Sequence, residues 1–161
     1  MNTSEAFSAI TFAGDRDLPR IFEVWESAVR ATHAFLAEAD LQFLIPLVKA
    51  GLADFGPIHC VRDGEGRVCA FMGVAGGKVE MLFVHADHRG RGAGRLLMEF
   101  AMQVLGADRV DVNEQNEGAV GFYRHLGFQP MGRSPLDPSG KPFPILHLAL
   151  DPKVLAPGGP R

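Results

Sequence analysis

Residues 79–105 read VEMLFVHADHRGRGAGRLLMEFAMQVL, and this stretch decides the fold. Its apolar beginning predicts a strand over Lys78–Val84, and the spacing of the later apolar residues predicts a helix over Gly92–Val104. A loop rich in arginine and glycine joins the two elements. Because the first turn of a helix has unpaired N–H groups and a partial positive charge, this junction is suited to binding an anion.

The loop carries a local positive charge in an otherwise acidic chain. Three arginines lie within seven residues, and no acidic residue occurs from His88 to Met98. Glycines at positions 90, 92 and 94 leave the backbone open to a phosphate group. A Walker loop would have Lys-Ser or Lys-Thr where Arg95-Leu96 stands, and the dinucleotide fingerprint would have a glycine at Leu97. A helix start without any ligand is the alternative interpretation.

The segments on either side predict a mixed sheet. The expected strands are Ser8–Ala13, Ile58–Arg62, Arg67–Ala75, Lys78–Val84, Arg109–Val112, Gly127–Gly132 and Phe143–Leu150. The expected helices cover residues 18–29 with Asp15 as the cap, Leu41–Leu52, Gly92–Val104 and Asn116–Leu126. Hairpins give antiparallel pairs, and a strand–helix–strand unit gives a parallel pair. We therefore expect an α/β fold with a mostly antiparallel sheet of about seven strands and helices on both faces.

Length, charge and cysteine content exclude several classes of protein. The 161 residues are expected to form one domain over 1–150 and a flexible tail over 151–161. A net charge of −3 argues against a nucleic-acid surface or a membrane anchor. The two cysteines, with no leader-like start and no long apolar run, indicate a cytoplasmic protein. A turn centred on residues 64–65 would place Cys60 opposite Cys69, and we still expect free thiols. No metal site is expected, because His85 and His88 have no third ligand nearby.

A second motif, later in the chain, resembles the signature of a known protein family. Residues 116–128 read NEGAVGFYRHLGF, which resembles the N-x-x-A-x-x-F-Y-x-x-x-G-F signature of GNAT N-acetyltransferases. The matching positions are Asn116, Ala119, Phe122, Tyr123, Gly127 and Phe128. Upstream, Arg89-x-x-Gly92-x-Gly94 resembles the Gln/Arg-x-x-Gly-x-Gly/Ala loop of the same family. Two motifs in the family's order are more specific than either alone, and segments near Trp25, Val112 and Gly132 resemble its bacterial YjaB-type branch.

The resemblance implies that acetyl-CoA binds between two splayed parallel strands, Lys78–Val84 and Arg109–Val112. Backbone groups of Leu82, Phe83 and Val84 would pair with the pantetheine arm. The pyrophosphate would bind the backbone N–H groups of Arg89, Gly90, Arg91, Gly92, Ala93, Gly94 and Arg95. Asn116 would lie on the cofactor side, and it also suits the cap of the following helix.

Tyr123 and Glu80 are the candidate catalytic residues. Tyr123 is the only tyrosine beside twelve phenylalanines, which favours a polar role for its hydroxyl. The resemblance implies that this hydroxyl protonates the departing thiolate, and simple aromatic packing is the alternative. Glu80 shares the strand parity of the cofactor-binding residues and is a candidate base, although a strand bulge would invert its direction. His33, His85 and a chain of water molecules are alternative routes for the acceptor's proton.

The predicted function is acetyl-CoA-dependent N-acetyl transfer, in which an amine attacks the thioester directly without an acyl-enzyme. Backbone N–H groups of the strand over Lys78–Val84 would stabilise the oxyanion. A non-catalytic acetyl-CoA-binding sensor is one alternative, and a different nucleotide-binding module with the same strand–loop–helix geometry is another. The acceptor amine, and the choice between monomer and homodimer, are open at this point.

Overall fold

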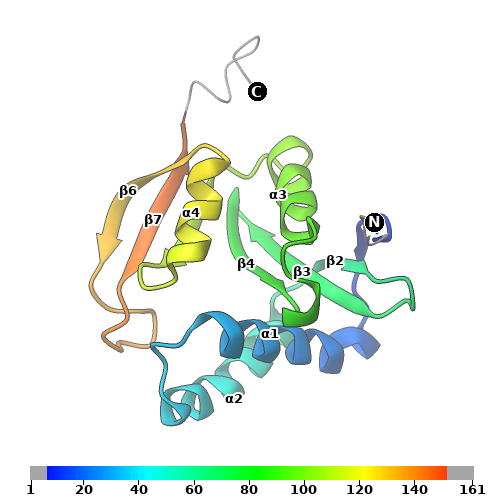
Figure 1. The fold of residues 1–161 in the computed structure, drawn as a ribbon, viewed down its shortest axis with the longest axis horizontal. Coiled ribbons are helices and arrows are strands. Elements are labelled where there is room, and N and C mark those ends of the chain that lie inside the picture. Colours follow the sequence, from blue (N-terminus) through cyan, green and yellow to red (C-terminus); the bar gives the residue numbers. More distant parts are fainter. Residues whose placement is uncertain (1–6, 152–161) are drawn as a thin grey trace.

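The computed structural model describes residues 7–151, so the expected tail lies outside the described residues except for Asp151. The strands are β1 (Thr11–Phe12), β2 (His59–Arg62), β3 (Val68–Ala75), β4 (Lys78–Val84), β5 (Arg109–Asn113), β6 (Phe128–Ser134) and β7 (Ile145–Leu150). They form one seven-stranded sheet in the order β1-β2-β3-β4-β5-β7-β6 (Figure 1). The helices are α1 (Leu18–Thr32), α2 (Glu38–Asp54), α3 (Ala93–Gln103) and α4 (Glu117–His125), with short 3-10 turns η1 (Asp15–Asp17) and η2 (Ala86–His88).

Strands β4 and β5 form the parallel pair of an otherwise antiparallel sheet. They are paired at only two positions, Lys78 with Arg109 and Val79 with Val110. Beyond these positions the two strands diverge, so that the gap-facing backbone groups of β4 have no partner strand. The expected mixed, mostly antiparallel sheet with a splayed parallel pair is confirmed.

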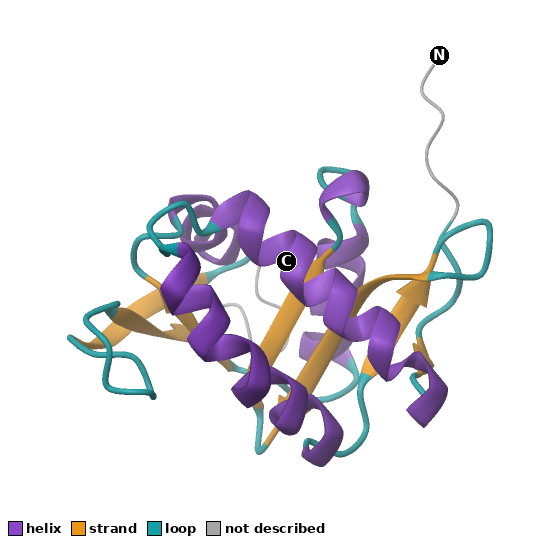
Figure 2. Ribbon diagram, turned by 90° about the horizontal axis from the view of Figure 1, so that it is seen from below, coloured by secondary structure: helices purple, strands orange, loops and turns teal. Residues whose placement is uncertain are grey.

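Helices cover both faces of the sheet, as Figure 2 shows for the face that bears α1 and α2. In α1 the buried residues recur at helical spacing, from Ile21 to Val29, and pack with Phe71 of β3 in one core cluster. On the opposite face, α3 and α4 pack over Val79, Val110 and neighbouring residues in a second cluster. Within residues 7–151, no helix is both long and apolar enough to cross a membrane.

A bulge in β4 changes the direction of the Glu80 side chain. Gly73 of β3 pairs with Met81, and the next residue, Val74, pairs with Val79, so Glu80 is the extra residue. As a result, Met81 packs with the α1 cluster while Leu82 packs with the α3 cluster. The expectation that the Glu80 side chain lies on the same face of the strand as Leu82 and Val84 is therefore wrong. The strand bulge that would invert its direction is present.

Two further expectations are corrected by local geometry. Cys60 pairs with Phe71 rather than Cys69 for two reasons. The turn is centred on Glu65, where the Asp63 amide donates a hydrogen bond to the Arg67 carbonyl. The register between β2 and β3 also shifts by one more residue between Val61 and Arg62. Both cysteines are buried and free. Asp15 does not cap α1, since it opens the 3-10 turn η1 that precedes the helix.

Candidate active site

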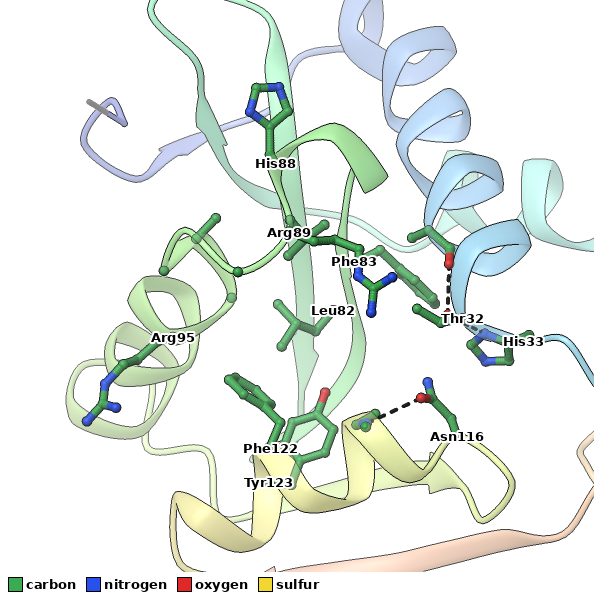
Figure 3. Close-up of a pocket in the computed structure, with 18 residues that line it drawn as sticks. Thr32, His33, Leu82, Phe83, His88, Arg89, Arg95, Asn116, Phe122 and Tyr123 are labelled. Atoms are coloured by element: carbon green, nitrogen blue, oxygen red, sulfur yellow. Dashed lines mark hydrogen bonds between the residues drawn. The ribbon is translucent and has the colours of Figure 1, made fainter. Parts of the chain in front are cut away.

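A groove of about 330 Å³ runs along β4 and across the starts of α3 and α4 (Figure 3). It contains most of the residues that the sequence indicates for the cofactor, namely Leu82, Phe83, Val84, Arg89, Gly90, Gly92, Ala93, Gly94, Arg95, Asn116 and Tyr123. Arg91 does not line it. We call this cavity the main groove. Its size lies within the range of small-molecule sites in proteins.

The loop before α3 presents backbone N–H groups to the main groove. Gly90 and Gly92 have φ values of +74° and +94°, which favour glycine. The first helical hydrogen bond runs from the Leu96 amide to the Gly92 carbonyl, so the amides before Leu96 are those that a helix leaves unpaired. The Ser27 hydroxyl accepts a hydrogen bond from the Ala86 amide at 3.0 Å, which ties the loop to α1. This arrangement suits an anion.

The arginines of the loop lie in different directions. The Arg89 side chain reaches over the main groove, whereas the Arg95 side chain points away from it (Figure 3). Arg95 donates to the Glu99 carboxylate at 3.0 Å on the helix surface. Fixed positive charge at the groove therefore comes from Arg89, and Arg95 contributes its backbone.

Helix α4 supplies the floor of the main groove. The Asn116 side chain accepts a hydrogen bond from the Ala119 amide at 3.2 Å, so it caps α4 and lines the groove at once. Tyr123 is 6% exposed and packs edge-on against Phe122 and Phe128. Burial raises the pKa of Tyr123, so its hydroxyl keeps its proton at ordinary pH. Figure 3 shows this hydroxyl pointing towards β4.

A second, smaller cavity of about 90 Å³ fills the gap between the diverging strands β4 and β5. We call it the gap cavity. It shares His33, Phe83, Asn116 and Tyr123 with the main groove. Glu80 from β4 and Asp111 from β5 line it as well. The gap cavity therefore leads from the main groove to the face of the sheet that carries Glu80.

A third cavity of about 420 Å³ lies between α1, α2 and β4, and we call it the apolar pocket. Its lining residues are Trp25, Val48, Gly51, Leu52, Phe55, Ala75, Glu80, Met81 and Phe83. Glu80 is the only ionisable residue among them, and it is shared with the gap cavity. An elongated apolar group with a cationic end would have its methylenes against these walls and its charge near Glu80.

His33, at the end of α1, lines both the main groove and the gap cavity. Burial lowers the pKa of His33 to about 4, so its imidazole is neutral at physiological pH. The sequence names His33 only as an alternative base, and it does not single out Ala28 or Thr32, which also line the main groove. Only the packing of α1 against β4 brings these residues to the site. His85, the other alternative, lines none of these three cavities.

A chain of polar contacts borders the gap cavity on the β5 side. Lys78 lies 2.5 Å from the Asp111 carboxylate, which also receives a 2.7 Å contact from Nδ1 of His147. Nε2 of His147 is 2.6 Å from the Ser134 hydroxyl. Burial acts to raise the pKa of Asp111, but the hydrogen bonds from Lys78 and His147 outweigh it and keep the pKa low. Nothing in the sequence pattern indicates this chain, because its members are far apart along the polypeptide.

No group of three His, Cys, Asp or Glu side chains between residues 7 and 151 is arranged to hold a metal ion. The groups of the site that can take part in chemistry are the amides of the loop, the Tyr123 hydroxyl and the carboxylates of Glu80 and Asp111.

Comparisons with known proteins agree with this geometry. Residues 54–130 match the model of the acetyltransferase (GNAT) domain. The chain is 40% identical over 126 residues to the peptidyl-lysine N-acetyltransferase YjaB of Escherichia coli K12, covering 78% of this chain and 85% of YjaB. The solution structure of apo YjaB from Escherichia coli superimposes with a TM-score of 0.82 at 36% identity, covering 89% of this chain and 97% of YjaB. The PaiA N-acetyltransferase of Thermoplasma acidophilum, solved in complex with coenzyme A, shares the fold at 17% identity, with a TM-score of 0.67 and coverage of 91% of this chain and 99% of PaiA.

Proposed function

The chain belongs to the GNAT family of acetyltransferases, and from this premise we propose that it transfers the acetyl group of acetyl-CoA to the ε-amino group of lysine side chains in proteins. The observation that carries the proposal is the gap cavity, because Tyr123 from the main groove and Glu80 from the apolar pocket both line it. A thioester on one side of the sheet and an amine on the other would meet there.

Acetyl-CoA lies along the main groove in this proposal. The amides before Leu96, together with Arg89, bind the pyrophosphate. The pantetheine arm follows Leu82, Phe83 and Val84, where β4 has lost its partner strand. This places the thioester at the gap cavity, beside the Tyr123 hydroxyl. The coenzyme A bound to PaiA, which shares this fold, supports the assignment.

The lysine acceptor enters from the opposite face. A lysine side chain has an apolar stem and a charged end, which match the apolar pocket and Glu80. The similarity to YjaB, named a peptidyl-lysine N-acetyltransferase, supports the same class of acceptor. The amine must lose a proton before it can attack, and Glu80 is the base, acting directly or through water.

The reaction is a direct transfer. The neutral amine attacks the thioester carbonyl carbon, and backbone N–H groups of β4 stabilise the oxyanion. The C–N bond forms, the C–S bond breaks, and Tyr123 gives its proton to the departing sulfur, while the surplus proton on the nitrogen passes through water back to Tyr123. Burial raises the pKa of Tyr123, so the hydroxyl is protonated at the start of each cycle.

The experiment uses two peptides with blocked N-termini that differ at one position, lysine in the first and norleucine in the second. We expect thiol release from acetyl-CoA with the lysine peptide only, and mass spectrometry places the acetyl group on that lysine. A third peptide has a free α-amino group and no lysine, and its acetylation in preference to the lysine peptide would contradict the proposed acceptor. If no amine tested caused thiol release from acetyl-CoA, the proposed transfer to lysine would be wrong.

A further inference from the structure

Two carboxylates face each other across the gap cavity, one from each diverging strand. Glu80 projects from the bulge of β4, and Asp111 lies in β5 two residues beyond the pairing of Lys78 with Arg109. The ammonium group of Lys78 bridges them. Its Nζ is 2.5 Å from Oδ2 of Asp111 and 3.9 Å from Oε1 of Glu80. A primary ammonium group therefore already lies at the edge of this cavity, and it belongs to the chain itself.

A histidine fixes the orientation of the Asp111 carboxylate through a hydrogen bond. Oδ1 accepts from Nδ1 of His147 at 2.7 Å, and Nε2 of His147 contacts the Ser134 hydroxyl at 2.6 Å. His147 is the direct cross-strand neighbour of Asp111, so the two side chains lie on the same face of the sheet. With Oδ1 fixed in this way, Oδ2 is the oxygen that meets an ammonium group.

The Tyr123 hydroxyl is a third polar group in the gap cavity. The Tyr123 side chain is more than nine-tenths buried and lines the gap cavity, and no hydrogen bond joins its hydroxyl to any of residues 7–151. This hydroxyl can therefore donate a hydrogen bond to an atom of a ligand bound in the cavity. The Tyr123 hydroxyl and the carboxylates of Glu80 and Asp111 thus line one cavity, in which the amine would meet the thioester.

Building on the function proposed above, we propose that the acceptor's ammonium group binds between Glu80 and Asp111, in the position that Lys78 occupies in this structure. Lys78 is thus an internal competitor, which the acceptor lysine displaces before it loses its proton. The site favours a cation at the end of a flexible apolar stem, because such a group can take over the contacts that Lys78 makes with the two carboxylates. Asp111 is a binding residue for the acceptor, and His147 is a positioning residue that acts through Asp111.

The test compares Lys78→Gln with Lys78→Arg and with Lys49→Gln. The first removes the competing cation, the second keeps it, and the third removes the same charge from α2, where Lys49 lies over the Phe22 ring. A partly exposed ion pair is worth ~1 kcal/mol or less, so Lys78→Gln should lower KM for the lysine peptide about threefold. Lys78→Arg and Lys49→Gln should leave KM within about twofold of the original. Asp111→Asn should raise KM about tenfold, because a charged hydrogen bond to the acceptor is lost.

A binding measurement separates this inference from the proposed function. Nα-acetyl-lysine methylamide and its norleucine analogue, which lacks the amine, are titrated into the CoA-saturated protein by calorimetry. The lysine compound should bind Lys78→Gln about threefold more tightly than the original protein, and the norleucine compound should bind both alike. If this binding pattern is observed but no peptide is acetylated, the proposed binding position of the ammonium group is supported and the proposed function is wrong. If the lysine peptide is acetylated but Lys78→Gln neither lowers KM nor tightens binding, the ammonium position is wrong and the function stands.

Discussion

The hydroxyl of Thr32 fixes the tautomer of His33. Thr32 Oγ1 donates its single proton to the Ala28 carbonyl at 2.8 Å and lies 2.8 Å from Nδ1 of His33. Nδ1 is therefore assigned as the protonated nitrogen, and Nε2 keeps a free lone pair. A neutral imidazole with this orientation can accept a hydrogen bond at the gap cavity.

His33 should make the protein less stable in mild acid. Burial lowers the pKa of His33 from its ordinary value of 6.5 to about 4 in the folded protein. Between these values the unfolded chain binds a proton that the folded chain does not bind, so stability falls as pH drops through this window. The loss should reach about 2 kcal/mol near pH 4.5. Urea unfolding at pH 7.5 and 4.5 should show the full loss of stability in the original protein and in His125→Gln, and a loss smaller by about 2 kcal/mol in His33→Gln, where His59 and His85, whose pKa values are also lowered by burial, still contribute. Equal slopes in all three would contradict the burial of a neutral His33.

Tyr123→Phe should lower turnover and leave the fold intact. The change removes the hydroxyl but keeps the ring contacts with Phe122 and Phe128. A thiolate leaves tolerably well without protonation, so we expect a loss of roughly 10- to 100-fold. The melting temperature should stay about the same, since the hydroxyl makes no hydrogen bond within residues 7–151 and the ring contacts are kept. Thiol release and acetyl-CoA calorimetry check this together. Unchanged turnover would make Tyr123 a packing residue, and a parallel loss of acetyl-CoA affinity would assign it to cofactor positioning.

Gly94→Val should weaken acetyl-CoA binding without unfolding the protein. A Cβ at Gly94 meets Val84 and Phe122 at 3.6 and 3.7 Å, which is ordinary contact, so the helix start tolerates it. The added methyl groups would stand where the cofactor's phosphates approach the amides, and losing one charged hydrogen bond costs about tenfold or more in affinity. Gly92→Val is a poorer choice, because its φ of +94° strains any side chain. Calorimetry gives the affinity and thermal melting is the control. Acetyl-CoA affinity equal to the original would exclude a phosphate site here.

The two thiols should be present as free cysteines that react only on unfolding. Cys60 and Cys69 are both fully buried, and burial raises the pKa of Cys60, so little reactive thiolate is exposed. A thiol reagent should label neither quickly in the native protein and both in denaturant without reductant. A quantitative disulfide in freshly purified protein would contradict this and also the predicted cytoplasmic location.

The sequence predicts the bounds of helices and strands, which depend on local residue patterns. It does not predict features that depend on the pairing register between strands. The bounds of β4 agree with the expectation, and α3 and α4 end within one residue of it, because apolar periodicity and glycine mark them. The bulge at Glu80 and the shift beside Arg62 arise from pairing with β3, which no single segment encodes. Helix α2 begins at Glu38, three residues before the expected start, because the Asp40 carboxylate accepts the Ala37 amide. Lys78, Asp111 and His147 meet only after the sheet has formed.

The brevity of the β4–β5 pairing has a consequence for folding. One half of the sheet, β1 to β4, is antiparallel and has α3 packed on it, while β5, β7 and β6 form a second antiparallel unit that packs against α4. With only two paired positions between them, the halves can open and reclose as separate cooperative units. Amide hydrogen exchange should therefore be slow within β3 and β7 and faster along this seam. A ligand bound to both strands would replace the hydrogen bonds that β4 and β5 do not make with each other. The amide hydrogens of the two units would then exchange at similar rates, because the units would open together.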